Sequence, residues 1–386
     1  MAKKNFTKVR KVYYVSGTED TKIADMAKTE KIKTKTNKGN KFGSGKGQNK
    51  SSGNVLKKKE RVPDIKNVEK DVLQCIMGQD KPVRQIITAI YRAINFKSIK
   101  SNILIIGNSG TGKTETIKQI AKRLRIPYTI EDATKYTQEG YYGADVEEMI
   151  YNLIENANHN IERAQNGIIV IDEIDKKAGH EAHDVSGTEV LKSLLKIIEG
   201  TKMKVPKDND PFGELVDFDT KNIIIVFLGA FSGLEKIRDK RLNTNSLGFV
   251  AKRPESEEQQ VHFLKQDLIK YGMPEEFVGR VDTIIEMNKL TKKDLALILK
   301  KSKLSIFRRY QAELRKMGIS LSYKGELFDR IAEQSLTLDT GARELSNTVN
   351  YMFENILYDV LMSPNKYKKC TLDLEIVQDN TKYELS

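Results

Sequence analysis

Apolar residues change their spacing twice along this 386-residue chain. They are sparse and irregular in residues 1–62, whereas from Pro63 onward short apolar runs alternate with stretches of helical spacing. After about Asn288 the spacing is mainly helical. The pattern predicts three parts: a tail over residues 1–62, an α/β domain over residues 63–288 and a smaller, mainly helical domain over residues 289–386.

The middle part predicts a parallel sheet that is covered by helices. Strands are expected at 102–106, 168–171 and 223–228, because these runs are almost entirely apolar, and helices at 68–96, 114–124, 144–164 and 187–199. Apolar strands that alternate with helices are typical of a sheet buried on both faces. In the third part we expect helices at 291–317, 325–334 and 341–362 and a strand at 371–377.

Charge separates the tail from the rest of the chain. Residues 1–62 hold 18 Lys and Arg against 5 Asp and Glu, a surplus that equals the +13 net charge of the whole chain. The other residues are therefore electrically balanced. A segment this polar cannot bury enough apolar surface to offset its ordering entropy, so we expect the tail to be disordered.

Composition also narrows the cellular setting. The longest apolar run, at 223–231, is far too short to span a bilayer, and the N-terminus lacks the apolar core of a signal peptide. The two cysteines, Cys75 and Cys370, cannot form a disulfide framework or a four-thiolate zinc site. We therefore expect a cytoplasmic protein with no membrane contact and no zinc.

A glycine-rich turn follows the strand expected at 102–106. It matches the P-loop pattern G-x-x-x-x-G-K-[ST] and lies between a strand and a helix, as that motif requires. Its residues are Gly107, Asn108, Ser109, Gly110, Thr111, Gly112, Lys113 and Thr114. The glycines let backbone N–H groups approach phosphates, Lys113 reaches the β- and γ-phosphates, and the Thr114 hydroxyl binds Mg²⁺. We therefore predict binding of ATP with Mg²⁺.

An acidic pair follows the strand expected at 168–171. Asp172 and Glu173 come at its carboxyl end, the edge at which ligands bind in open parallel sheets. We predict that Asp172 holds Mg²⁺ together with Thr114, and that Glu173 acts as general base on the attacking water. With the P-loop, this pair predicts hydrolysis of ATP rather than binding alone.

Residues 68–361 resemble the ClpX family of AAA+ unfoldases, hexameric ATPases that deliver proteins to the ClpP peptidase. The resemblance rests on the sequences IMGQ at 76–79, LLKIIEGT at 194–201, QDLIKYGMPEEFVGR at 266–280 and TGARELS at 340–346. The related HslU family shares several of these motifs. The short stretch between Lys113 and Asp172 leaves no room for the large inserted domain of HslU, so ClpX is the better match.

The resemblance implies an AAA+ P-loop domain followed by a small, mainly helical lid domain, and it implies further site residues. Ile76 would lie beside the adenine, and Arg343 would be the sensor-2 arginine on the phosphates. Arg280 would be the arginine finger that reaches the ATP of a neighbouring subunit, where it stabilises charge on the transferred phosphoryl group. These roles imply a homohexamer.

The resemblance also implies what the ATPase acts on. Tyr141 and Tyr142 correspond to the pore loop that grips the substrate, where the family usually carries Tyr followed by Val. Leu247, Gly248 and Phe249 correspond to the tripeptide that docks on ClpP. The implied function is a protein unfoldase and translocase that threads protein substrates through a hexameric pore to a ClpP-like peptidase, with no proteolytic activity of its own.

Departures from the family leave alternatives open. Residues 1–62 contain no cysteine, whereas the N-terminal zinc domain of the family needs four. The first alternative keeps the motor without the peptidase, as a disassembly chaperone. A less favoured one is a DNA-associated AAA+ ATPase that contacts nucleic acid through the basic tail, although we expect that tail to be merely solvated.

Overall fold

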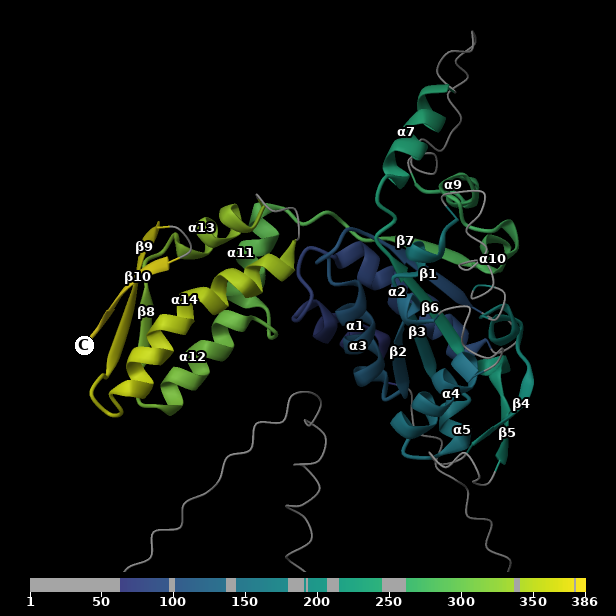
Figure 1. Ribbon diagram of the computed structural model, residues 1–386, viewed down its shortest axis with the longest axis horizontal. Helices are drawn as coiled ribbons and strands as arrows, with labels where there is room; N and C mark the ends of the chain where they lie inside the picture. Colours follow the sequence, from purple (N-terminus) through teal and green to yellow (C-terminus); the bar gives the residue numbers. More distant parts are fainter. Residues whose placement is uncertain are drawn as a thin grey trace, which may run out of the picture. The chain divides into compact units, whose positions relative to one another are not determined.

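The computed structural model describes residues 63–96, 101–136, 144–179, 191, 194–206, 215–244, 262–336, 341–377 and 380–386. The tail predicted at 1–62 lies outside these residues. The described chain forms an α/β domain, followed by a mainly helical domain that carries a three-stranded sheet (Figure 1). No helix among the described residues has the length and apolar character needed to cross a membrane.

A five-stranded sheet forms the centre of the large domain, in the order β2-β3-β6-β1-β7, and every strand pairing in it is parallel. The strands are β1 (Asn102–Ile106), β2 (Tyr128–Asp132), β3 (Ile168–Asp172), β6 (Ile224–Gly229) and β7 (Thr283–Glu286). The predicted parallel sheet is confirmed. The two strands that the apolar pattern did not reveal, β2 and β7, lie at its edges. Their apolar runs are short: buried Thr129 and Glu131 interrupt β2, and half-exposed Thr283 and Glu286 bound β7.

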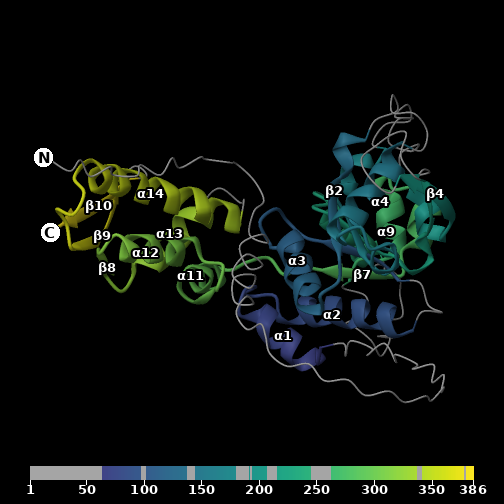
Figure 2. The same ribbon diagram turned by 90° about the horizontal axis from the view of Figure 1, so that it is seen from below.

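Successive residues of each strand face opposite sides of the sheet. Ile103 and Ile105 of β1 pack in a cluster with α1 (Ile65–Leu73), α2 (Asp80–Asn95) and α3 (Lys113–Leu124), which gather on one side in Figure 2. Leu104 and Ile106 join the opposite cluster, with α4 (Ala144–Asn156) and the helical residues 194–199. Both faces are therefore buried, as the sequence predicts.

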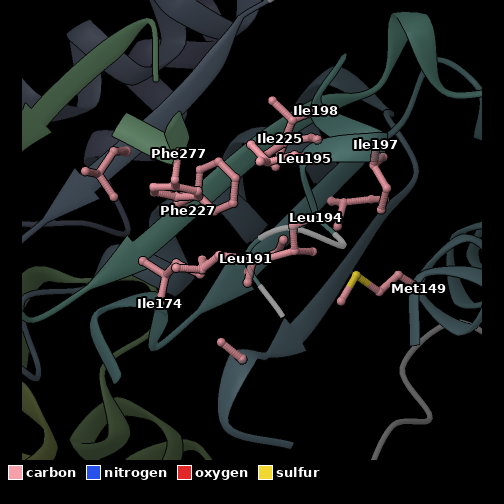
Figure 3. Close-up of a cluster of buried hydrophobic side chains, with 14 of the residues drawn as sticks. Met149, Ile174, Leu191, Leu194, Leu195, Ile197, Ile198, Ile225, Phe227 and Phe277 are labelled. Atoms are coloured by element: carbon pink, nitrogen blue, oxygen red, sulfur yellow. The ribbon is translucent and has the colours of Figure 1, made fainter. Parts of the chain in front are cut away.

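The second cluster extends to the end of the large domain. Figure 3 shows Phe227 of β6 beside Phe277 of α10 (Glu275–Arg280), with ring centroids 4.8 Å apart and ring planes at 71°. The other elements of this domain are α5 (Ile161–Ala164), α7 (Leu234–Thr244), α9 (Lys265–Tyr271), the antiparallel hairpin of β4 (Lys202–Pro206) and β5 (Leu215–Asp219), and the short 3₁₀ helices η1 (Ala133–Lys135), η2 (Ile174–Lys177) and η3 (Thr220–Asn222).

A buried ion pair joins α7 to α9. The Arg241 guanidinium donates to both carboxylate oxygens of the fully buried Asp267, at 2.9 and 3.0 Å. Arg241 Nη2 also donates to the His262 carbonyl at 2.9 Å. A bidentate pair of this kind fixes both position and orientation, so it holds together the two flanks of residues 245–261, which themselves lie outside the described part of the chain.

Among its described residues, the small domain has four helices, three of which contact a sheet of order β10-β9-β8. Its elements are α11 (Lys292–Lys301), α12 (Ile306–Lys316), β8 (Ser320–Tyr323), α13 (Leu327–Leu336), α14 (Ala342–Met362), β9 (Lys369–Val377) and β10 (Asn380–Leu385). Phe307 lies at the centre of its core, in edge contact with Phe328 and Phe353. Thr291 and Asp294 form a capping box at the start of α11.

Three helices predicted as continuous are each broken in two. The 68–96 helix is interrupted between α1 and α2, where Gly78 adopts φ +74°, and the 144–164 helix is interrupted at Asn158 and His159, with φ +55° and +56°. The 291–317 helix is interrupted after Lys301. Helical spacing continues across such a break when both pieces face the same core, so the apolar pattern alone does not reveal it.

Candidate nucleotide site

The P-loop connects the carboxyl end of β1 to the start of α3. The Gly107 N–H donates to the Gly229 carbonyl at 3.2 Å, and a Cβ atom at Gly107 would lie only 2.7 Å from the Cβ of Met287. Gly112 adopts φ +90°, which allows the chain to turn directly into α3, and no side chain caps that helix. The first N–H groups of α3 are therefore available to an anion.

Lys113 lies almost buried at this turn, with 9% of its surface exposed. Its ammonium group donates to the carbonyl of Gly107 and, at 3.1 Å, to that of Asn108. Burial lowers the pKa of Lys113 below its ordinary value of 10.5, while the carboxylates of Asp172 and Asp175 oppose that shift. The charged form of Lys113 is thus poorly solvated here, so a phosphate group would stabilise it.

The acidic pair lies directly opposite the P-loop helix. The Thr114 hydroxyl donates to Asp172 Oδ2 at 2.7 Å, and the Glu173 N–H donates to Asp172 Oδ1 at 2.9 Å. Glu173 itself is exposed and adopts φ +58°. A hydroxyl and a carboxylate oxygen in contact are donors of the type that Mg²⁺ prefers, so these residues fit the metal that accompanies a nucleotide.

Asp175 is a buried residue of the site to which sequence analysis gave no role. It is 3% exposed, and its two carboxylate oxygens accept the N–H groups of Ala230 and Phe231, each at 3.2 Å. It thereby fixes the chain after β6 beside the chain after β3. Its signal in the sequence is a third acid, two positions after the pair of Asp172 and Glu173.

One cavity collects most of the predicted phosphate-binding residues. It has a volume of about 650 Å³, and residues from four regions line it: Ser109, Gly110, Gly112, Lys113 and Thr114 of the P-loop, Asp172 and Glu173 after β3, Ala230 and Ser232 after β6, and Arg343 of α14. The structure therefore brings together residues that are up to 234 positions apart in the sequence, from Ser109 to Arg343. We call it the phosphate cavity.

A second cavity, of about 310 Å³ and mainly apolar, adjoins the first. Cys75, Ile76 and Met77 line it from the large domain, together with Gly110, Thr111 and Gly112 of the P-loop; Ile298, Leu299 and Leu345 line it from the small domain. Both cavities share Gly110, Gly112, Glu115, Ala342 and Ser346. An apolar space next to a phosphate cavity suits the base of a nucleotide, so we call it the base cavity.

The small domain contacts the P-loop backbone directly. The Ala342 N–H donates to the Gly110 carbonyl at 3.2 Å. Gly341 adopts φ +60°, and a Cβ atom there would lie 2.9 Å from the Ser109 carbonyl oxygen. Only glycine allows this conformation and this approach together. The start of α14, which carries Arg343, is therefore held at the P-loop.

Arg280 lies apart from both cavities of its own chain. Its exposed guanidinium forms an ion pair with Glu199 at 2.5 Å, and its carbonyl accepts the Asn102 side-chain amide at 2.9 Å. The remaining predicted site residues, Tyr141 and Tyr142 of the pore loop and Leu247, Gly248 and Phe249 of the docking tripeptide, lie outside the described residues.

A P-loop at the carboxyl edge of a parallel sheet, an acidic pair opposite it and a helical domain at its mouth define a nucleotide-binding ATPase of the AAA+ class. Family comparison agrees: the AAA domain family (Cdc48 subfamily) matches residues 98–284, and the C-terminal D2-small domain family of ClpB protein matches residues 290–373.

Curated relatives identify the branch of that class. A protein of Treponema denticola is 34% identical over 323 residues, covering 77% of each chain; one of Bacteroides thetaiotaomicron is 32% identical over 353 residues, covering 85% of this chain and 84% of its own; one of Borrelia duttonii is 35% identical over 321 residues, covering 78% and 75%. Each is named ATP-dependent Clp protease ATP-binding subunit ClpX. The chain belongs to the ClpX family.

Proposed function

We propose that the chain is an ATP-driven protein unfoldase and translocase that acts as a homohexamer and delivers polypeptides to a ClpP-like peptidase. Family membership supports the proposal, since the relatives are named as the ATP-binding subunit of a protease. The observation that carries it is the contact of Ala342 with the P-loop carbonyl of Gly110, next to Arg343 in the phosphate cavity. Through this contact, a change at the phosphates would act on the small domain.

In this proposal, each residue around the phosphate cavity has a separate task. Thr114 and Asp172 hold Mg²⁺, which neutralises charge on the phosphates, and Lys113 binds the β- and γ-phosphates. Glu173, exposed to the same cavity, orients and deprotonates the attacking water. Arg343 contacts the phosphates from α14, and Ile76 lies beside the adenine in the base cavity.

Arg280 acts on the ATP of a neighbouring subunit. Its position outside both cavities of its own chain, with Glu199 as its partner, supports an action between subunits. We propose residue 288 as the boundary between the large and the small domain; the end of β7 at Glu286 and the start of α11 at Lys292 support it. The peptide bonds of the substrate are cleaved by the partner peptidase, and the chain contributes no proteolytic centre of its own.

The function is tested by degradation of an unfolded model protein. With ATP and ClpP we expect degradation, and with ClpP omitted we expect unfolding of a folded substrate without cleavage. ATP-dependent unfolding that never leads to cleavage by ClpP would favour the disassembly chaperone instead. Tight, salt-sensitive binding of duplex DNA that disappears when residues 1–62 are removed, without any unfolding, would favour the DNA-associated ATPase.

The peptidase contact is tested separately from the motor. The double variant Leu247→Ser with Phe249→Ser is expected to lose ClpP-dependent degradation while it keeps ATP hydrolysis and unfolding. Phe96→Ser is a matched control, because Phe96 is 59% exposed at the end of α2 and has no proposed partner role. Full degradation by the double variant would show that the tripeptide does not dock the peptidase.

A further inference from the structure

The side-chain amide of Gln79 joins the P-loop to the chain that leaves the large domain. Its Nε2 donates to the Thr111 carbonyl at 3.3 Å and to the Asn288 carbonyl at 2.9 Å, while its Oε1 accepts the Asn288 N–H at 2.8 Å. The residue is completely buried. One amide thus holds both backbone groups of Asn288 and one carbonyl of the phosphate-binding turn.

Gln79 ends a short segment that also contacts the small domain. We call residues 74–79, between α1 and α2, the bracket segment. The Ser302 hydroxyl donates to the Cys75 carbonyl at 2.6 Å, and the Lys303 N–H donates to the Gln74 carbonyl at 2.9 Å. These bonds attach the bracket segment to the chain just after α11.

The start of α11 is held by the same segment. The Asn288 side-chain amide donates to the Gly78 carbonyl at 2.9 Å. A Cβ atom at Gly78, which has φ +74°, would lie 2.7 Å from Cγ of Asp294 in the first turn of α11. The bracket segment therefore contacts both ends of α11, and its residues Cys75, Ile76 and Met77 line the base cavity.

We propose that Gln79 is a positioning residue that couples nucleotide occupancy of the P-loop to the orientation of the small domain, through its bonds to Thr111 and Asn288. The proposal rests on the nucleotide site proposed above and deepens it. A buried amide that loses its partners costs free energy, so Asn288 cannot shift relative to Thr111 without these bonds breaking or the bracket segment moving too. Such a connected, fully bonded element is able to transmit a change between two sites.

The test measures domain orientation directly. Fluorophores are placed through Lys122→Cys on α3 and Lys316→Cys on α12, both exposed positions, and energy transfer is compared without nucleotide, with ADP and with a non-hydrolysable ATP analogue. Gln79→Met keeps the length of the side chain and removes all three hydrogen bonds. Gln85→Met, on the exposed face of α2, is the matched control.

If Gln79 couples the two sites, its loss should spare nucleotide binding but abolish the change in domain orientation. In Gln79→Met the nucleotide still binds, weakened about 2- to 30-fold as is typical of residues that couple sites, but saturating nucleotide no longer changes energy transfer. The unaltered protein and Gln85→Met keep that change. A normal change in Gln79→Met, complete loss of nucleotide binding, or no change in the unaltered protein would each overturn the proposal.

A second variant covers the case in which Gln79→Met does not fold, which a thermal melt detects. Asn288→Ala removes the bond to Gly78 at an exposed position and leaves the backbone groups of residue 288 bonded to Gln79. It is expected to reduce the nucleotide-dependent change in energy transfer without abolishing it, and an unreduced change would count against the proposal. Because these measurements need neither ClpP nor a protein substrate, they remain informative if the unfoldase proposal fails.

Discussion

The phosphate cavity and the base cavity meet at the P-loop but differ in how they are built. The phosphate cavity is lined by charged and polar groups, and most of them come from the carboxyl edge of one rigid sheet. The base cavity is mainly apolar and is lined by the bracket segment, α11 and α14 of two domains. The proposed catalytic groups are thus placed mainly at one edge of the sheet, while the base cavity is closed by the small domain.

This difference assigns different kinds of binding energy to the two cavities. Groups that contact the transferred phosphoryl act most strongly in the transition state, whereas contacts to the base are the same before, during and after hydrolysis. Variants of the phosphate cavity should therefore change kcat, and variants of the base cavity should change KM alone.

Removing the proposed general base, the carboxylate of Glu173, should have the largest effect on ATP hydrolysis. Glu173→Gln keeps the size of the side chain but cannot accept the proton of the attacking water, so kcat is expected to fall about 10²- to 10⁴-fold. Nucleotide affinity should stay nearly unchanged, because within the described part of the chain the Glu173 carboxylate makes no hydrogen bond to the P-loop. Steady-state ATPase assays and equilibrium binding of a fluorescent ADP measure the two quantities.

The control for this variant is Glu148→Gln, which makes the same change at an exposed position of α4. It should retain full ATPase activity. If Glu173→Gln kept wild-type kcat, the water would have to be activated by another group in the phosphate cavity, and the contrast between the two cavities would lose its main support.

Lys113 should link nucleotide affinity to pH. Burial lowers its pKa from 10.5, so part of the free protein loses this proton as the pH rises through the lowered pKa. Bound phosphates favour the charged form, hence binding takes up a proton, and the affinity for ADP should fall with rising alkaline pH. Lys113→Met should weaken binding about 10- to 100-fold, as expected for a lost charged hydrogen bond, and should remove this pH dependence.

Titration calorimetry in alkaline buffers of different ionisation enthalpy measures the proton uptake. Lys122→Met, at an exposed position on the same helix α3, is the matched control and should bind ADP with the normal pH dependence. A pH dependence that survives in Lys113→Met would have to come from another group, so the affinity could not be attributed to the buried lysine.

Shortening Ile76 should affect the base cavity alone. Ile76→Ala removes three carbon atoms from its lining, so KM and the Kd of ADP are expected to rise together by about tenfold, which corresponds to burial of about two of them against the base. The value of kcat should not change. Ile126→Ala, at a half-buried residue packed on the same core but away from the cavity, controls for general loosening. A lower kcat in Ile76→Ala alone would contradict the separation of the two cavities.

The sequence predicts the two cavities unequally, for a physical reason. The P-loop from Gly107 to Thr114 and the pair Asp172 and Glu173 are local motifs at strand ends, and parallel topology brings such ends to one edge. The base cavity depends on tertiary contacts between segments more than 200 residues apart, such as Ser302 with Cys75 at a separation of 227. Only Ile76 was expected there, and that expectation came from the resemblance to a family.

In the fold, too, the sequence pattern reveals some elements and misses others. Apolar runs revealed the central strands, which are buried on both faces, but not the edge strands β2 and β7, in which Thr and Glu residues interrupt or bound the apolar run. The break at Gly78 was hidden because α1 and α2 pack on the same core. That break forms the bracket segment, so the part of the nucleotide site that joins the domains lies where the apolar pattern predicted an ordinary helix.

The smallest expected effect is protection of Cys75 from alkylation by bound ADP, for which Cys370 serves as an internal control. Cys75 is buried in the lining of the base cavity, whereas Cys370 is buried in the core of the small domain, where burial raises its pKa to about 11. Bound ADP would cover Cys75 and leave Cys370 as it is. We therefore expect ADP to slow alkylation of Cys75 by iodoacetamide several-fold, measured by peptide mass spectrometry, while the slow reaction of Cys370 keeps its rate because little of its thiolate is present. Equal slowing at both sites would mean that ADP stabilises the whole fold instead of filling the base cavity.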